Sequence, residues 1–335
     1  MAADREILLA GDIGATKTVL ALYAGWPGRP LRQQSFRNAD YVDFWPLVEG
    51  FLDDGGLRPV IACLGIAGPV TANRVHMTNL NWSIDGEAMR QRFGLRQVHL
   101  INDLVATAVG AVHLPETELK VLNRGQAQAN AVQAVLAPGS GLGESFLVPC
   151  DGSFLPCASE GGHASFAPRN ELQSDLLTFM RSKQEHVSVE QVCSGLAVPS
   201  LFAFMATRFP VPDWLRDQLQ QAVDPTPVIL GAGMRALQDD TASCVVASRT
   251  LQLFLDILAD EAANLVLKTL AFGGLFLGGG LSARLQSCID PKAFMAVFCR
   301  GTYRERLAGV PIRIILNPET ALLGAAAYGA GAVVR

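Results

Sequence analysis

The segment Gly11-Asp12-Ile13-Gly14-Ala15-Thr16-Lys17-Thr18 decides the fold of this 335-residue chain. It lies between two apolar runs, residues 7–10 and 19–23. Small residues at the end of a strand let backbone N–H groups turn toward an anion. A dinucleotide-binding or Walker loop opens into a helix, whose N-terminus holds the phosphate. Residues 18–24 are instead β-branched and apolar until Gly25-Trp26-Pro27-Gly28. We therefore expect a second strand, with the phosphate-binding loop at the tip of a hairpin.

The same arrangement recurs further along the chain. An apolar run at residues 131–136 leads to Pro138-Gly139-Ser140-Gly141-Leu142-Gly143 and then to another apolar run. Asp151-Gly152 is a hairpin signal, and residues 154–158 follow it as a further strand. The first unit likewise continues to an extended run at residues 31–36. This duplication favours an α/β, two-domain, actin-like (ribonuclease H-like) fold with an interdomain cleft, the architecture of sugar kinases, heat-shock proteins and actin.

Composition bounds the class of protein. Half of the residues are apolar, 17% are charged and the net charge is −4, so a large core is available and a nucleic-acid partner is not expected. The seven cysteines lack CxxC spacing, which favours buried thiols over disulfides or zinc. The most apolar stretch, residues 270–281, contains five glycines and falls short of the ~20 residues of a spanning helix. We expect a cytoplasmic protein with no membrane partner.

Periodicity and capping signals give the expected elements and domains. A small α/β domain is predicted over residues 1–113 plus 317–335, carrying the first phosphate loop. A large α/β domain is predicted over 114–316, with the second phosphate loop and a helical region. Ser282 and the pair Thr226-Pro227 are expected to begin helices. Other expected strands are 60–66, 98–101, 276–277 and 312–316, and other expected helices are 83–93, 104–112, 171–181, 189–192 onward, 199–209, 241–270 and 320–329.

Asn102-Asp103 follows a predicted buried strand and precedes a predicted helix. Asp103 could simply cap that helix. Ligands of open α/β sheets, however, bind at the carboxyl ends of strands, where a carboxylate can accept a proton from a substrate hydroxyl. The position of Asp103 in the sequence does not favour either interpretation over the other.

Other polar residues also allow two interpretations. Ser159-Glu160-Gly161-Gly162-His163 offers a carboxylate and an imidazole for a polyol, or forms a polar turn. Glu190 lies in a capping-box pattern, Ser188-Val189-Glu190-Gln191, where an acidic residue suits the first turn of a helix. Asp12 could hold Mg²⁺ through water or stiffen the loop as an Asx turn. Lys17 could bind phosphate or face solvent, and Gly278-Gly279-Gly280 could approach an adenine ring or allow tight packing.

Taken together, these segments resemble the bacterial glucokinase family nearly end to end. The resemblance rests on the order and spacing of several motifs rather than on a single one. They are Gly11–Thr18, Met77-Thr78-Asn79 with Trp82, Ile101-Asn102-Asp103, Gly139–Gly143, Glu160-Gly161-Gly162-His163 with Phe166-Ala167-Pro168, His186-Val187-Ser188 with Glu190, and Asn317-Pro318.

The resemblance implies an ATP-dependent kinase that converts glucose to glucose 6-phosphate in glycolysis, acting as a homodimer. It implies that Asp103 is the catalytic base and that Asn102, Asp103, Glu160, His163 and Glu190 bind the sugar. Asp12, Gly14, Ala15, Thr16, Gly139, Ser140, Gly141, Gly279 and Gly280 would bind ATP, and Mg²⁺ would have no direct protein ligand beyond Asp12 through water. The alternatives are a kinase for another hexose or an amino sugar, and a non-catalytic sugar sensor on the same fold.

The chain departs from the family pattern in three places. Gly14-Ala15-Thr16-Lys17 stands where the family usually has Gly-Gly-Thr-Asn, and Ser140 replaces a threonine. Ser194-Gly195-Leu196-Ala197-Val198 stands where the family has Ser-Gly-Pro-Gly-Leu. No cysteine-rich zinc motif follows His163, which distinguishes the chain from the related repressor/kinase group.

Overall fold

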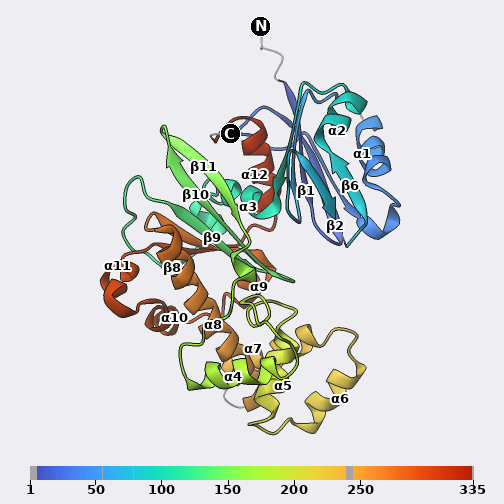
Figure 1. Ribbon diagram of the computed structural model, residues 1–335. Coiled ribbons are helices and arrows are strands. Elements are labelled where there is room, and N and C mark those ends of the chain that lie inside the picture. Colours follow the sequence, from blue (N-terminus) through green and yellow to red (C-terminus); the bar gives the residue numbers. More distant parts are fainter. Residues whose placement is uncertain (1–5, 55, 78, 239–243, 334–335) are drawn as a thin grey trace. The chain divides into compact units, whose positions relative to one another are not determined.

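A computed structural model describes residues 6–54, 56–77, 79–238 and 244–333. The chain divides into two compact units (Figure 1). Unit 1 comprises Met1–Glu118, Ser145–Ala158 and Asn317–Arg335, and unit 2 comprises Leu119–Glu144 and Ser159–Leu316.

The main sheet of unit 1 begins with the predicted hairpin. β1 and β2 are antiparallel, β3 continues the meander, and β4 and β7 extend the sheet in parallel with β1, giving the order β3-β2-β1-β4-β7. These strands are β1 (Ile7–Ile13), β2 (Lys17–Ala24), β3 (Arg32–Arg37), β4 (Ile61–Ile66) and β7 (Gln97–Asn102). A separate ribbon pairs β5 (Arg74–Met77) with β6 (Trp82–Asp85).

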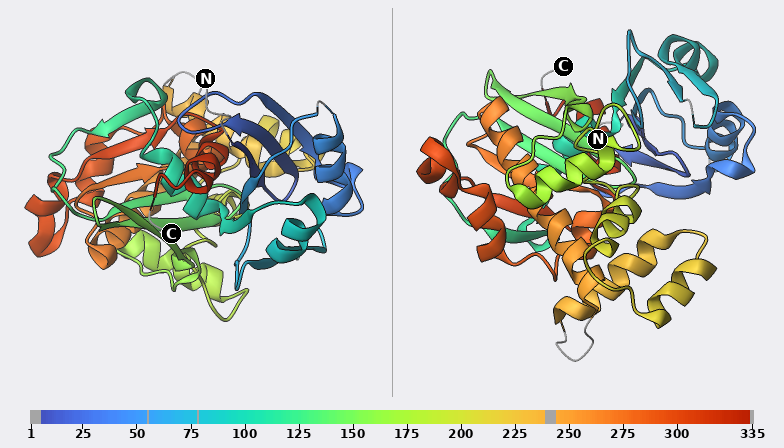
Figure 2. Two further views of the ribbon diagram at one scale, coloured as in Figure 1. Left: turned by 90° about the horizontal axis from the view of Figure 1, so that it is seen from above. Right: turned by 60° about the horizontal axis from the view of Figure 1, so that its bottom comes forward.

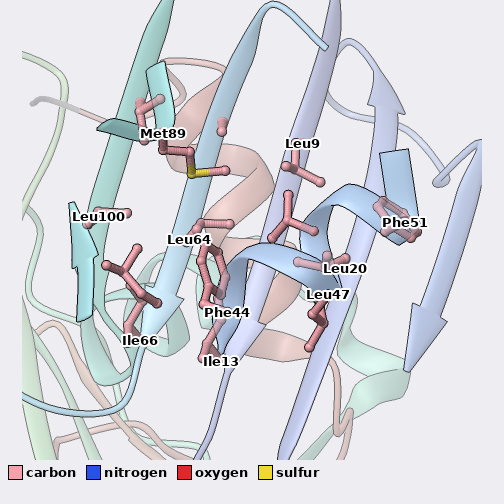
Figure 3. Packing of buried hydrophobic residues seen from close by; sticks show 14 of the residues in the cluster. Leu9, Ile13, Leu20, Phe44, Leu47, Phe51, Leu64, Ile66, Met89 and Leu100 are labelled. Carbon is pink, nitrogen blue, oxygen red and sulfur yellow. The ribbon is translucent and has the colours of Figure 1, made fainter. Parts of the chain in front are cut away.

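Helices cover each face of this sheet because the strands alternate apolar side chains between the faces. Leu9 and Ile13 of β1 pack with Phe44 and Leu47 of α1 (Phe44–Asp53) and with Met89 of α2 (Gly86–Phe93), as Figure 3 shows. The opposite cluster joins residues of β1 and β2 to α3 (Asp103–Ala111) and α12 (Thr320–Gly329). The core of unit 1 is therefore a sheet between two helical layers.

The second sheet repeats this topology. Its order is β11-β10-β9-β12-β13-β8, with β9, β12 and β13 parallel and β8 antiparallel at one edge. The predicted duplication of strand, glycine loop, strand, turn and strand is thus present. Its strands are β8 (Leu119–Asn123), β9 (Gln133–Pro138), β10 (Leu142–Cys150), β11 (Ser153–Ser159), β12 (Gly274–Leu277) and β13 (Ile312–Ile315).

Helices fill the rest of unit 2, where α5 and α7 pack against the long helix α8 (Figure 2). The helices are α4 (Glu171–Arg181), α5 (Val198–Ala206), α6 (Asp213–Gln221), α7 (Pro225–Gln238), α8 (Val245–Thr269), α9 (Gly279–Leu285), α10 (Pro291–Phe298) and α11 (Arg304–Ala308). Short 3₁₀ turns are η1 (Asn38–Asp40), η2 (Glu116–Glu118), η3 (Gly161–His163) and η4 (Gly301–Tyr303). No helix in the described part of the chain is long and apolar enough to cross a bilayer.

The start of the expected helix at residues 83–93 is wrong. Trp82 and Ile84 are buried while Ser83 is exposed, so this segment follows the two-residue period of a strand and forms β6. Asp85 then caps α2, accepting hydrogen bonds from the backbone N–H groups of Glu87 and Ala88. The helix begins only after that cap.

Two further helix starts are also corrected. α7 begins at Pro225 rather than Pro227, and the Asp224 carboxylate accepts a hydrogen bond from Thr226 N–H at 2.9 Å. α9 begins at Gly279, so Ser282 lies inside the helix and does not cap it. Residues 241–243 of the expected long helix, and Thr78 of the Met77–Asn79 motif, lie outside the described residues.

Candidate active site

The first phosphate loop is a tight turn at the tip of the β1–β2 hairpin. Ile13 pairs with Thr18, and Gly14 N–H donates to the Lys17 carbonyl oxygen at 3.0 Å. Ala15, Thr16 and Lys17 are exposed. The loop is thus shorter than the eight-residue segment suggested, because Gly11, Asp12 and Ile13 belong to β1.

Asn38, which the sequence analysis did not single out, holds this loop in place. Its side chain donates to the Gly14 carbonyl oxygen at 2.8 Å and accepts from the Thr18 hydroxyl at 2.8 Å. Its backbone N–H donates to the Thr16 carbonyl oxygen at 3.0 Å. Asn38 is 1% exposed, so these bonds are shielded from water and fix the loop.

A cavity of about 290 Å³ opens beside the loop in unit 1. It is lined by Asp12, Gly14, Thr16, Lys17 and Val19, and by Pro318, Glu319 and Leu322. Burial raises the pKa of Asp12 to about 6, and the positive charge of Lys17 opposes the shift. The carboxylate is therefore costly to keep charged unless a cation approaches it.

Asn102 and Asp103 lie at the same sheet edge as this loop. The paired positions Ile13, Ile66 and Asn102 end the parallel strands β1, β4 and β7. Neighbouring strands are about 4.8 Å apart, so one intervening strand separates the two strand ends by roughly 10 Å. The sheet therefore brings the loop and the Asn102-Asp103 pair to one edge.

The structure also decides which of these two residues caps the helix. The Asn102 side chain accepts hydrogen bonds from Leu104 N–H at 2.9 Å and Val105 N–H at 3.3 Å, and it donates to the Gly68 carbonyl oxygen. Asp103 is the first residue of α3 and is half-buried, with Oδ1 3.0 Å from Leu104 N. The interpretation of Asp103 as the cap of α3 is thus wrong, because Asn102 is the N-cap residue.

In unit 2, the second phosphate loop joins β9 to β10. Gly139 N–H donates to the Gly141 carbonyl oxygen at 2.8 Å, and Ser140 at the tip is exposed. Gly279 lies against the end of β9, where a Cβ would overlap the Pro138 carbonyl oxygen, whereas a Cβ at Gly280 would meet open space. Gly279 is therefore explained by packing, and the face of Gly280 is accessible.

Glu160, His163 and Glu190 come together in unit 2. His163 Nε2 is 3.8 Å from Glu160 Oε2, and His163 Nδ1 is 3.9 Å from Glu190 Oε1. Residues 164–166 pair with 187–189 through backbone hydrogen bonds, which bring Glu190 beside the Glu160–His163 turn. The side chains of Glu160 and His163 are exposed, so the cluster can accept and donate hydrogen bonds to a ligand.

The expected helix at residues 189–192 onward is not formed. The capping-box bonds exist, because Ser188 N–H donates to Gln191 Oε1 at 2.8 Å and Gln191 N–H approaches the Ser188 hydroxyl at 3.4 Å. The residues that follow form turns instead. Val192 and Cys193 N–H bond within the segment, whereas the N–H groups of residues 195 and 196 donate to carbonyl oxygens of the second phosphate loop. Glu190 Oε2 accepts a hydrogen bond from Leu142 N–H at 2.8 Å, next to the second phosphate loop.

Glu144 is a second residue that sequence reasoning missed. It is 3% exposed, and its carboxyl group fills the space that a Cβ at Gly161 would occupy. Burial and the neighbouring negative charge of Glu261 raise the pKa of Glu144 to about 7, although Lys268 opposes the shift. A buried carboxyl group therefore packs directly against Gly161 of the Glu160–His163 turn.

The oxygen-bearing side chains near the first phosphate loop suit a magnesium ion that is held mainly by substrate phosphates. Within the described ranges, no group of three or more His, Cys, Asp or Glu side chains could hold a metal ion. Asp12 supplies a carboxylate in a cavity that Glu319 and Thr16 also line. Mg²⁺ usually keeps several waters and binds through one or two carboxylates plus substrate phosphates, so these residues fit it.

Comparison with known proteins gives consistent matches. The family profile described as "Glucokinase" matches residues 9–332. The glucokinase of Nostoc punctiforme is 36% identical over 339 residues, which cover 96% of this chain and 98% of that protein. The crystal structure of a glucokinase from an Antarctic psychrotroph has a TM-score of 0.84 and 32% identity, covering 97% of this chain and 99% of that chain.

A more distant structure shares the fold. A ROK-family glucokinase from Streptomyces griseus, solved with glucose and AMPPNP, has a TM-score of 0.65 and 20% identity, covering 96% of this chain and 99% of that chain. The actin-like α/β fold predicted from the hairpin loop is confirmed, and so is the family resemblance. The chain belongs to the glucokinase family.

Proposed function

We propose that this protein is a glucokinase that transfers the γ-phosphoryl group of ATP to the 6-hydroxyl of glucose. The observation that carries the proposal is the position of Asp103 at the sheet edge that also holds the first phosphate loop. A kinase must place a proton acceptor near the transferring phosphoryl group. The relative from Streptomyces griseus was solved with glucose and AMPPNP, which agrees with this pair of substrates.

Asp103 serves as the general base in this proposal. Its carboxylate accepts the proton of the 6-hydroxyl while the sugar oxygen forms a bond to phosphorus and the bond to the ADP oxygen breaks. Because Asn102 satisfies the N–H groups of Leu104 and Val105, the helix does not depend on Asp103 for its cap. The cap of α3 is therefore supplied by Asn102 whatever role the Asp103 carboxylate has.

The sugar ligands are Asn102, Asp103, Glu160, His163 and Glu190. Carboxylates accept hydrogen bonds from ring hydroxyls, and an imidazole can donate or accept one. Glu160, His163 and Glu190 form one cluster, which supports a shared ligand. Hydrogen-bonding sites of this kind reject analogues that lack or misplace a hydroxyl, because a polar group that the bound sugar covers would be left unpaired.

The two loops hold the nucleotide. Backbone groups of Gly14, Ala15 and Thr16 and of Gly139, Ser140 and Gly141 bind the phosphates, and Gly279 and Gly280 lie against the adenine. Asp12 would hold Mg²⁺ on the phosphates through water, and the ion would neutralise charge on the phosphoryl oxygens. The raised pKa of Asp12 supports this role, since a nearby cation would stabilise its carboxylate.

A substrate panel tests the reaction. Purified protein with Mg-ATP is assayed for ADP formation with glucose, mannose, fructose and glucosamine. We expect glucose to give the highest kcat/KM. A higher value with another sugar would assign the protein to that hexose or amino sugar. ADP formation with none of the sugars, despite glucose binding, would identify a sugar sensor.

Single variants test the sugar ligands. Replacing Glu160, His163 or Glu190 by Ala should raise the Kd of glucose tenfold or more, because each loses a hydrogen bond to a charged or polar group. Glu185→Ala, at an exposed position outside the cluster, is the matched control and should bind glucose as the wild type does. Unchanged glucose affinity in the three cluster variants would place the sugar elsewhere.

We further propose a cytoplasmic homodimer, on the family resemblance. Light scattering during size-exclusion chromatography at micromolar protein should give about twice the 35.7 kDa mass of one chain. A mass equal to one chain would contradict the dimer.

A further inference from the structure

Residues 188–197, called here the bridging segment, contact both the Glu160–His163 turn with the residue after it and the second phosphate loop of unit 2. On one side, Glu190 N–H donates to the Gly162 carbonyl oxygen at 2.9 Å and Val189 N–H donates to Ala164 at 2.9 Å. On the other side, Gly195 N–H donates to the Gly139 carbonyl oxygen at 2.8 Å, and Leu196 N–H donates to Ser140 at 3.2 Å. Four backbone N–H groups of the bridging segment thus connect it to two neighbouring segments.

The Glu190 carboxylate makes the same connection through its two oxygens. Oε2 accepts a hydrogen bond from Leu142 N–H at 2.8 Å, at the end of the phosphate loop. Oε1 lies 3.9 Å from His163 Nδ1, on the side of the sugar ligands. Because both oxygens belong to one planar carboxylate, the hydrogen bond to Oε2 restricts the positions that Oε1 can take.

We propose that the bridging segment couples the two substrates: glucose held at Glu190 Oε1 orders the phosphate loop, and nucleotide on that loop tightens glucose binding. The inference rests on the proposed function, since it takes Glu190 as a sugar ligand. A first ligand that orders the segment leaves less ordering for the second to accomplish, which gives positive cooperativity. Thermodynamic linkage requires the effect to be equal in both directions.

Gly195 is the position at which this coupling can be broken without touching a sugar ligand. A Cβ there would lie 2.9 Å from the Gly139 carbonyl oxygen and 3.6 Å from Ser140 Cα, both backbone atoms. Gly195→Ala should therefore displace the phosphate loop from the bridging segment. Thr226→Val is a milder second variant, because it removes the hydrogen bond from the Thr226 hydroxyl to the Gly195 carbonyl oxygen at 3.2 Å.

The experiment measures the Kd of glucose by calorimetry with and without saturating Mg-AMPPNP. Their ratio is the coupling factor, which we expect to be about fivefold or more in the wild type, as is common for coupled sites. Without nucleotide, the glucose Kd of Gly195→Ala should stay within about twofold of the wild-type value. Its coupling factor should fall to within about twofold of one. Thr226→Val should lower the factor less. Gly231→Ala, whose Cβ meets only the Arg235 guanidinium at 3.6 Å, is the matched control and should keep it.

Three results would overturn the proposal. They are a wild-type coupling factor of one, a wild-type factor retained in Gly195→Ala, and a loss of glucose affinity in Gly195→Ala without nucleotide. If Gly195→Ala does not fold, as judged by circular dichroism, a wild-type factor in Thr226→Val overturns the proposal. Failure of the proposed function is distinguishable, because Glu190→Ala would then bind glucose as tightly as the wild type whatever Gly195→Ala does.

Discussion

At the scale of single residues, Glu144 gives the protein a pH-dependent stability. Its pKa is about 7 in the folded protein and has an ordinary value of 4.5, so the folded protein holds this proton more tightly than the unfolded chain. Stability therefore falls as pH rises from about 4.5 to about 7 and stays reduced above that range. Glu144→Gln removes the charge and keeps the shape.

We expect Glu144→Gln to raise the free energy of unfolding by up to about 3 kcal/mol at pH 8, and by less than about 1 kcal/mol at pH 5. Urea unfolding at the two pH values measures the difference. Glu185→Gln, an exposed control, should change stability at neither pH. Equal stability of wild type and Glu144→Gln at pH 8 would show that the buried carboxyl group carries no charge penalty.

The sequence indicated candidate polar residues for the site but not the residues that support them. Asp12, Asp103, Glu160, His163 and Glu190 could be named as candidates from their polar side chains and neighbours, and the family resemblance gave them roles. Asn38 and Glu144 could not, because their roles depend on contacts with distant segments. Nothing in the local sequence of Asn38 indicates that its side chain reaches back to the Gly14 carbonyl oxygen.

At the scale of elements, α3, which begins at Asp103, crosses α12 closely. A Cβ at Gly324 would overlap the Ala106 carbonyl oxygen, and a Cβ at Gly110 would overlap the Thr320 carbonyl oxygen. The two helices can approach this closely only because both positions lack a side chain. Both obstructing atoms belong to the backbone, so a substitution must move a helix.

Gly324→Ala should lower the free energy of unfolding by about 1–3 kcal/mol, the usual cost of overpacking. Gly50→Ala is the matched control, because it lies in α1 and its Cβ would meet nothing within 4 Å. It should raise stability by about 0.5–1 kcal/mol through its better helix propensity. Both values come from urea unfolding, and a neutral Gly324→Ala would show that the crossing adapts.

Two helices were predicted with their observed bounds, α4 and α12. The segments at 83–85 and 189–192 were assigned to helices because capping residues lie near apolar ones. In the first case Trp82 and Ile84 pack as a strand, and in the second the N–H groups of Val189 and Glu190 bond to the neighbouring segment 162–164. Tertiary contacts thus outweighed local signals.

At the scale of the whole molecule, the duplication was the most informative prediction. Sheet orders β3-β2-β1-β4-β7 and β11-β10-β9-β12-β13-β8 both begin with a meander joined to parallel strands. Two glycine loops in otherwise apolar sequence were enough to indicate this. The helical region of unit 2 was less predictable. α6 was not foreseen, because it is short, mostly polar and buries only Leu215.

The central claim is that Asp103 is the general base of a glucose kinase, and Asp103→Asn tests it most directly. The amide keeps the shape of the side chain but cannot accept the proton, so kcat should fall by about 10²-fold or more. Asp43→Asn, which changes a helix-capping aspartate of α1 in unit 1, is the matched control and should keep full activity.

The measurement is kcat for ADP formation with glucose and Mg-ATP, together with the Kd of glucose by calorimetry. The account predicts that Asp103→Asn loses nearly all turnover while its glucose Kd stays within a few fold of the wild type. Turnover close to that of the wild type and of Asp43→Asn would contradict the account.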